Sequence, residues 1–212
     1  MDKRGNLPRS FMDALSAHIV ETSARQRTTF VAIDGLGCSG KSTFAEELSQ
    51  TLGRDTIWTG TDDFFAEFRS SDWDESSPVR HLRWSEMLAT LDDLRESGEA
   101  VVRSWDWKRG ELCPPRLVQG GVVLFEGLHS LEKEIVGLYD LRIWVEGRMD
   151  NRLDRLAARD GPEVCAVWQR DFIAPEQVYL TSERPWEKAD VVVAGADLTV
   201  NDIGRQLSAY LR

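Results

Sequence analysis

The sequence contains little of what several protein classes require. Its cysteines, Cys38, Cys113 and Cys165, are odd in number and include no C-x-x-C pair, so neither a disulfide framework nor a zinc site is indicated. No run of eighteen apolar residues occurs, and the first residues lack the apolar stretch of a signal peptide. Internal repeats and low-complexity tracts are also missing. We therefore expect these 212 residues to form one soluble, cytoplasmic domain, either alone or with a small appendage.

Positive charge is also scarce. The net charge is -10 and the isoelectric point is near 4.9, whereas binding to a phosphate backbone or an anionic membrane needs clustered basic residues. Nucleic acids and membranes are therefore not expected as partners. We expect a small-molecule substrate, and the sequence leaves open whether the chain forms a homo-oligomer.

The most informative stretch lies between Thr28 and Leu48. Its Gly35 and Gly40-Lys41-Ser42 match the phosphate-loop pattern G-x-x-x-x-G-K-[ST], with an apolar strand before the loop and a helix after it. Backbone N–H groups and the helix N-terminus would bind a triphosphate, Lys41 would reach its β and γ phosphates, and Ser42 would bind Mg²⁺. An ordinary glycine turn is the alternative. The residues expected to bind ATP are Gly35, Leu36, Gly37, Cys38, Ser39, Gly40, Lys41, Ser42 and Thr43.

Apolar runs and turn residues predict alternating strands and helices, and hence an α/β fold with a parallel sheet. The predicted N-terminal segment, residues 1–27, contains a helix over 10–26 that would pack on the core. The main domain would occupy 28–212. Trp58 and Trp144 are expected in the core. Strands are predicted at 30–33, 56–59, 100–104, 121–125, 141–145 and 191–193, a turn at 110–116, and further helices at 42–53, 85–97, 130–138, 148–159, after 162 and from about 201.

Acidic residues follow several of these strands, at the edge where parallel sheets place their sites. Glu126 follows an apolar strand and is a candidate Mg²⁺ ligand together with Ser42. Asp62 or Asp63 could accept the proton of an attacking hydroxyl, although an Asp pair after a strand is also a common helix cap.

Two further groups of residues are candidates. Arg152, Arg155 and Arg159 share one face of a predicted helix and could stabilise a transferred phosphate, or else form salt bridges with neighbouring aspartates. Trp73, Trp105 and Trp107, beside Asp74 and Asp106, suit a flat hydroxylated ligand or packing at the sheet edge.

In this order, the runs GLGCSGKST, TDDFF, SWDW, VVLFEGLHSL and LRIWVEGRMDNRLDRLAARD resemble the uridine kinase and phosphoribulokinase family of P-loop kinases. The resemblance covers about residues 29–193. It implies the P-loop NTPase fold with five parallel strands, a small arginine-bearing lid at about 148–172, and use of ATP and Mg²⁺. It also implies that Asp62 is the base and that Glu126 lies near Mg²⁺, with the three arginines in the lid.

The same resemblance places the substrate at Asp63 and Phe65, at Trp105-Asp106-Trp107 in place of the family's Y-D-F, and at Trp73-Asp74 in place of its F-D-H-P. Tryptophan stands at both aromatic positions, the histidine is missing and the lid is short, which leaves the acceptor open.

These patterns predict an ATP-dependent kinase that phosphorylates a hydroxyl of a small molecule, with uridine or cytidine as first candidates. Nicotinamide riboside, pantothenate or a sugar is the alternative within the same chemistry. A regulatory ATPase or GTPase is the alternative of another class, but no N-K-x-D motif occurs and Glu126-Gly127 replaces a D-x-x-G switch.

Overall fold

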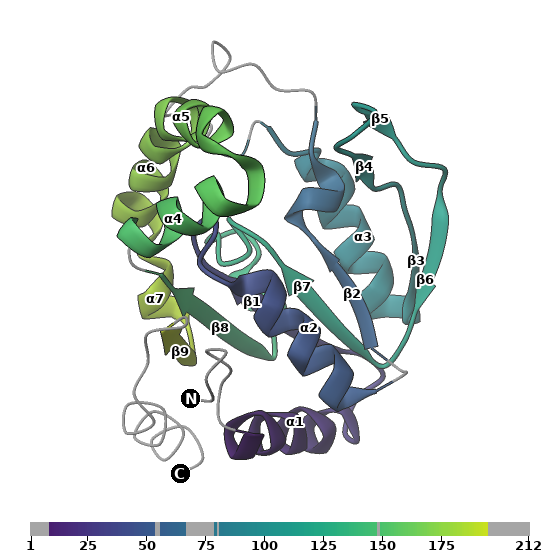
Figure 1. Ribbon diagram of the computed structural model, residues 1–212. Coiled ribbons are helices and arrows are strands. Elements are labelled where there is room, and N and C mark those ends of the chain that lie inside the picture. The colour runs from purple at the N-terminus through teal and green to yellow at the C-terminus, as the bar shows by residue number, and fades with distance from the viewer. Residues whose placement is uncertain (1–8, 54–55, 67–78, 80, 148, 195–212) are drawn as a thin grey trace.

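The computed structural model describes residues 9–53, 56–66, 79, 81–147 and 149–194. Its centre is a sheet of order β2-β7-β1-β8-β9 in which all neighbouring strands are parallel (Figure 1). This confirms the predicted α/β fold with a five-stranded parallel sheet. The strands are β1 (Thr29–Asp34), β2 (Thr56–Gly60), β7 (Val122–Glu126), β8 (Leu141–Glu146) and β9 (Val191–Ala194).

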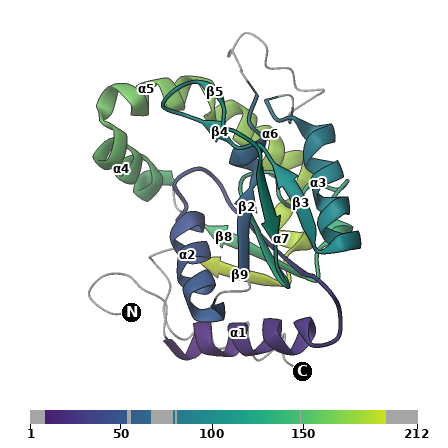
Figure 2. The ribbon, with the colours of Figure 1, turned by 90° about the vertical axis from the view of Figure 1, so that its right-hand side faces the viewer.

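Helices α1 (Arg9–Ser23) and α2 (Lys41–Leu52) pack together with one face of the sheet. In α1, Phe11, Leu15 and Ile19 recur every four residues and so share one buried face, as the sequence predicted. Val20, which fitted that face less well, is 55% exposed. Helix α1 lies at the end of the molecule opposite the carboxyl ends of the strands (Figures 1 and 2).

The other face is covered by α3 (Trp84–Ser97) and by two antiparallel strands, β3 (Glu99–Val102) and β6 (Arg116–Gln119). The strand expected at 100–104 therefore exists, but it pairs outside the main sheet. The turn expected at 110–116 is only partly one, because β5 (Glu111–Leu112) pairs there with β4 (Trp105–Asp106).

The carboxyl edge of the sheet carries the remaining elements. A 3₁₀ turn, η1 (Thr61–Phe64), follows β2. Three helices, α4 (Met149–Asp160), α5 (Pro162–Asp171) and α6 (Ile173–Glu183), lie above this edge on one side and the β4–β5 ribbon on the other (Figures 1 and 2). We call α4, α5 and α6 the lid helices. The short α7 (Pro185–Lys188) then leads to β9.

Two local predictions were wrong. The helix expected over 130–138 is a series of turns that ends in the short 3₁₀ helix η3 (Val136–Leu138). Trp144 is buried as expected, but Trp58 is 40% exposed because β2 is an edge strand of the sheet. The helix expected from about residue 201 lies outside the described residues.

Within the described part of the chain, no helix has both the length and the apolar character needed to cross a membrane.

Candidate active site

The phosphate loop connects β1 to α2, as its sequence predicts. Gly40 directly precedes α2 and has φ = 105°, a left-handed conformation that glycine adopts without strain. The backbone then turns into α2 at Lys41, so the N-terminus of this helix faces the end of the sheet. The structure thus brings residues 35–43 into one loop that can cradle an anion.

Four polar side chains from three segments line one cleft of about 520 Å³ next to this loop: Lys41, Ser42, Asp62 and Glu126. Lys41 Nζ donates to the Leu36 carbonyl oxygen at 3.2 Å and lies 3.8 Å from Glu126 Oε1. The Ser42 hydroxyl donates to Glu126 Oε2 at 3.4 Å. Because β2 and β7 are adjacent and parallel, with Gly60 opposite Glu126, Asp62 comes out at the same edge as Glu126.

Both carboxylates of the cleft have raised pKa values. Burial raises the pKa of Asp62 and of Glu126, and the positive charge of Lys41 opposes the shift in each case. Asp62 is open to water on the cleft side, yet protein atoms around it displace enough solvent to disfavour its charged form. A raised pKa makes a carboxylate a stronger base when it is ionised.

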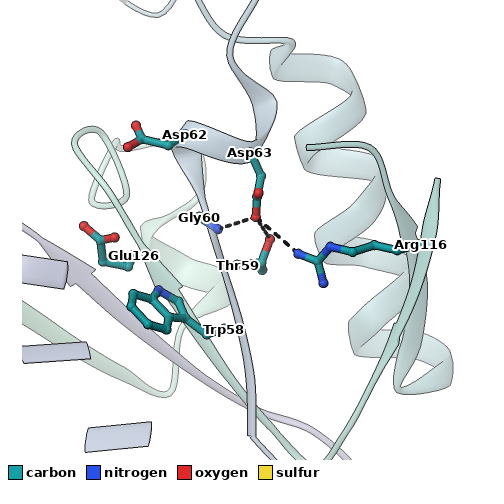
Figure 3. Close-up of a pocket in the computed structure, with 7 residues that line it drawn as sticks. All are labelled: Trp58, Thr59, Gly60, Asp62, Asp63, Arg116 and Glu126. Atoms are coloured by element: carbon teal, nitrogen blue, oxygen red, sulfur yellow. Dashed lines mark hydrogen bonds and ion pairs between the residues drawn. The ribbon is translucent and has the colours of Figure 1, made fainter. Parts of the chain in front are cut away.

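Asp63 occupies a different environment. Its carboxylate accepts hydrogen bonds from Thr59 Oγ1 at 2.6 Å and from the Gly60 N–H at 3.3 Å, and it lies 3.6 Å from Arg116. Figure 3 shows it turned toward Arg116, away from the carboxylates of Asp62 and Glu126, although all four residues line a smaller pocket of about 210 Å³. Of the two adjacent aspartates, Asp62 is therefore the one that faces the phosphate loop.

An aromatic wall closes the cleft on the side of the β4–β5 ribbon. The Phe65 ring lies 4.3 Å from that of Trp107 and 5.7 Å from that of Trp105. His81, which the sequence did not single out, also lines the cleft, with its ring 6.2 Å from that of Phe65. Phe65 and Trp107 thus line the cleft, whereas Trp105 contacts Phe65 without lining it, and their role in binding a substrate stays a prediction.

Asp106 is not among the residues that line the cleft. Its Oδ1 accepts hydrogen bonds from the N–H groups of Lys108 (2.9 Å) and Arg109 (3.0 Å), so it caps the turn of the ribbon. Trp73 and Asp74 lie outside the described residues.

The three arginines of α4 have different surroundings. Arg159 lines the cleft, with its guanidinium on Asp160. Arg155 donates to the carbonyl oxygens of Cys38 (3.0 Å) and Ser39 (3.2 Å). Arg152 is buried, and it donates to the Gly37 carbonyl oxygen and to Glu176. Only Arg159 reaches the space in which a substrate would lie.

The buried Asp34 links the loop to the rest of the edge. Its carboxylate accepts hydrogen bonds from the N–H groups of Gly35 (2.6 Å) and Leu131 (2.8 Å) and from the hydroxyl of Tyr179. Burial raises the pKa of Asp34 to about 7, while the hydrogen bonds and Lys41 oppose that shift.

Sequence reasoning missed several residues of this edge. They are His81, Trp168, Phe172, Glu176 and Tyr179. No spacing connects Glu176 or Tyr179 to the loop, because each contacts a partner at least 139 residues earlier in the chain. The only signal in the sequence for these residues was Trp168, in the short run after Asp160.

The oxygen ligands present fit a magnesium ion with a bound triphosphate. Mg²⁺ in such sites takes one or two protein oxygens and fills its other positions with phosphate and water. Ser42 and Glu126, whose oxygens are already 3.4 Å apart, offer those two positions. Among the described residues, no group of three or more His, Cys, Asp or Glu is placed to hold a metal ion.

This combination of a phosphate loop, two strand-end carboxylates and a helical lid agrees with the family model that matches the sequence. That model, for the phosphoribulokinase / uridine kinase family, matches residues 30–164, which is more than half of the chain. The chain belongs to this family. The name of this family, like those of the two relatives described next, is the name of kinases.

Two curated relatives are named uridine kinase. One, from Halobacterium salinarum, is 27% identical over 139 residues, which are 61% of this chain and 61% of the relative. The other, from Mycoplasma pneumoniae, is 24% identical over 179 residues, 77% of this chain and 83% of the relative. The match thus spans less than two thirds of the first relative's length.

Two solved structures show the same fold. One, from Silicibacter sp. TM1040, is provisionally described as a fructose transport system kinase; it has a TM-score of 0.71 and 20% identity, covering 85% of this chain and 98% of that one. The other, from Bacillus stearothermophilus, is provisionally described as a uridine kinase; it has a TM-score of 0.67 and 21% identity, covering 87% and 98%. At these identities the likeness is evidence for the fold alone, which is the P-loop kinase fold.

Proposed function

We propose that this protein transfers the γ-phosphoryl group of ATP to a hydroxyl of a nucleoside. The observation that carries the proposal is a single cleft in which Asp62, Lys41 and Ser42 lie across from the aromatic wall of Phe65 and Trp107. A phosphate site, a carboxylate and aromatic rings in one cleft suit a ring-bearing alcohol.

When bound, MgATP supplies the phosphoryl group and the positive charge of the metal. The residues of the chain then have distinct roles. Lys41 and the loop N–H groups hold the phosphates, and Ser42 and Glu126 hold the metal. Asp62 would accept a hydrogen bond from the acceptor hydroxyl, orient it and take its proton as the new P–O bond forms and the bond from the γ-phosphorus to the oxygen of the leaving ADP breaks.

Arg159 is the arginine placed to offset the charge that builds up on the transferred phosphoryl group, because it lines the cleft and its charge acts on Asp62. The lid helices exclude water on that side, which limits hydrolysis of ATP without an acceptor.

Support for a nucleoside comes from the aromatic wall and from the two relatives named uridine kinase. A base can stack on Phe65 or Trp107 while the 5′-hydroxyl of the sugar reaches Asp62. The cleft volume of about 520 Å³ suits a small molecule.

The proposal is tested by ATP consumption with Mg²⁺ against uridine, cytidine, nicotinamide riboside, pantothenate and free sugars including fructose, with a control without acceptor. Turnover that depends on uridine or cytidine is the expected result. Turnover only with another alcohol would keep the kinase chemistry and reject the nucleoside. Equal turnover without any acceptor would reject the transferase and favour a regulatory ATPase.

A further inference from the structure

The backbone of Gly37, in the middle of the phosphate loop, is bound at both its N–H and its carbonyl group by a buried ion pair. Arg152 Nε, from α4, donates to the Gly37 carbonyl oxygen at 2.6 Å, and Glu176 Oε1, from α6, accepts from the Gly37 N–H at 2.7 Å. Arg152 and Glu176 are also hydrogen-bonded to each other, and each residue is 1% exposed. Two helices that lie more than a hundred residues after the loop in the sequence thus contact the same loop residue.

Trp168, from α5, covers this contact. Its ring lies against the guanidinium of Arg152, which is 5.0 Å from the ring centroid. A Cβ atom added to Gly37 would come within 2.8 Å of the Trp168 ring and 3.1 Å of Glu176 Oε1. The loop and the three lid helices therefore fit together without room for a side chain at this position.

The contacts control the direction in which the loop N–H groups point. In a trans peptide unit, the carbonyl of one residue and the N–H of the next point in opposite directions. Arg152 binds the carbonyl of Gly37, and Arg155 binds those of Cys38 and Ser39. With these carbonyls turned toward α4, the N–H groups of Cys38 and Gly40 point the other way, where a phosphate would lie. The Ser39 N–H instead donates to the Leu36 carbonyl oxygen at 3.1 Å, within the loop.

We propose that Arg152 and Glu176 are a positioning pair, which sets the phosphate-binding conformation of the loop through the Gly37 peptide. Glu176 compensates the buried charge of Arg152 and fixes the plane of its guanidinium, so that Nε stays aimed at the Gly37 carbonyl. The pair acts on the nucleotide through the loop and does not contact it. This inference rests on the proposed kinase function, and within it Arg159 alone of the three arginines acts at the transferred phosphate.

The test uses two changes that affect the pair differently. Glu176→Gln leaves the charge of Arg152 uncompensated. Arg152→Lys keeps the ion pair, but a single ammonium group cannot hold a carbonyl and a carboxylate in the fixed plane of a guanidinium. The matched control is Glu183→Gln on the same helix, because Glu183 pairs with Lys188 and accepts from the Lys133 N–H instead of contacting the loop.

For the full-length chain and each variant, the dissociation constant for MgADP is measured by calorimetry, kcat and KM for ATP by turnover, and folding by urea unfolding. MgADP binding needs no acceptor, so the result does not depend on which alcohol is the substrate. We expect both variants to bind MgADP roughly tenfold to a hundredfold more weakly, since misplacing a positioning group by about 1 Å can cost a hundredfold. The urea midpoint of Arg152→Lys and the MgADP affinity of Glu183→Gln should stay close to those of the wild type.

MgADP affinity within twofold of the wild type in a folded Arg152→Lys protein would overturn the proposal, and the pair would then only stabilise the fold. If Glu176→Gln does not fold, Arg152→Lys alone decides. If the wild-type protein itself does not bind MgADP, the kinase function fails, and the positioning role fails with it.

Discussion

At the scale of single residues, the cleft concentrates its chemistry in Lys41 and Asp62. Lys41 is 9% exposed, and its ammonium group lies between the Leu36 carbonyl oxygen and Glu126. Asp62 stands in a 3₁₀ turn at the end of an edge strand, where water and a substrate both have access. Both side chains line the cleft, so we expect the fold to survive replacement of either one.

Replacing Lys41 with Ala, or Asp62 with Asn, should lower kcat by about a hundredfold or more, because each change removes a group that binds phosphate or accepts the proton. Circular dichroism should show that both variants are folded. Asp63→Asn is the matched control for Asp62→Asn, since the Asp63 carboxylate is turned toward Arg116. Near-normal turnover in Asp62→Asn would remove this residue from the role of base.

The prediction for Gly37 adds a side-chain atom, whereas the changes at Lys41 and Asp62 remove a functional group. In Gly37→Ala the new methyl group would collide with the Trp168 ring, so either the loop or α5 must shift. We expect KM for ATP to rise by about tenfold or more. Gly53→Ala after α2 is the control because open space surrounds its Cβ position, although its φ of 92° costs some stability. An unchanged KM for ATP in Gly37→Ala would show that the lid helices adjust freely.

At the scale of elements, Arg83 joins three segments that form the acceptor side of the cleft. It directly precedes α3, and its guanidinium donates to the carbonyl oxygens of Asp63 (2.8 Å), Phe65 (3.3 Å) and Arg103. It also forms an ion pair with Glu86. The turn that bears Asp62 and the strand that leads to Trp105 are thus held by one side chain.

In Arg83→Leu, these carbonyl oxygens lose their donor, so we expect stability to fall by about 1–3 kcal/mol. KM for the acceptor should rise more than KM for ATP, because the aromatic wall moves and the phosphate loop does not. Urea unfolding and steady-state kinetics check both effects. The control is Arg95→Leu on the same helix, because the exposed Arg95 lies over the Phe30 ring, 4.9 Å from its centroid, and not against these carbonyl oxygens. Equal changes in both KM values would contradict a local role for Arg83.

Sequence patterns predicted the elements whose structure is determined locally. The phosphate loop is contiguous, and the central strands β1 and β7 are largely apolar runs buried on both faces. Strands β3 and β6 carry exposed Val101 and Leu117 opposite each other, and their antiparallel pairing has no local signal. The apolar spacing over 130–138 is helical, but the Leu131 N–H is bonded to the distant Asp34 instead of to a preceding turn.

The residues of the candidate site also fall into two groups: those that sequence patterns identify and those that only the fold brings to the site. Lys41, Ser42, Asp62 and Glu126 each follow a strand or belong to a motif, and so could be identified from their positions in the sequence. Glu176 sits in an unremarkable helix, and only the three-dimensional fold brings it to Gly37. Edge position likewise cannot be read from one strand, which is why the exposure of Trp58 was not predicted.

At the scale of the whole molecule, one buried carboxylate connects the sheet to the C-terminal part of the described chain. Asp34 ends β1 and holds the Leu131 N–H and the Tyr179 hydroxyl. Its pKa is raised from 3.8 to about 7 by burial, so the folded protein holds a proton here that the unfolded chain releases near pH 4. Stability should therefore depend on pH below neutrality.

The sign follows from proton binding. Well below pH 4, Asp34 is protonated in both the folded and the unfolded protein, and its contribution to the free energy of unfolding is complete. As the pH rises toward 7, Asp34 ionises first in the unfolded chain, which stabilises the unfolded chain, and the contribution is lost. We expect the free energy of unfolding of the wild type to fall relative to that of Asp34→Asn between pH 4 and pH 7, by on the order of 4 kcal/mol at most. Urea titrations of both proteins across this range measure the difference. Parallel pH profiles would contradict the assignment to Asp34.

The contacts of Gly37 also have a consequence for how the protein is made. On the ribosome, the phosphate-loop sequence emerges early, but Arg152, Trp168 and Glu176, which hold the loop, are synthesised more than a hundred residues later. A nascent chain that ends before α4 therefore carries the complete nucleotide-binding motif without the contacts that shape it. Nucleotide capture should begin only after α6 has been synthesised, so that ATP does not bind to shorter nascent chains.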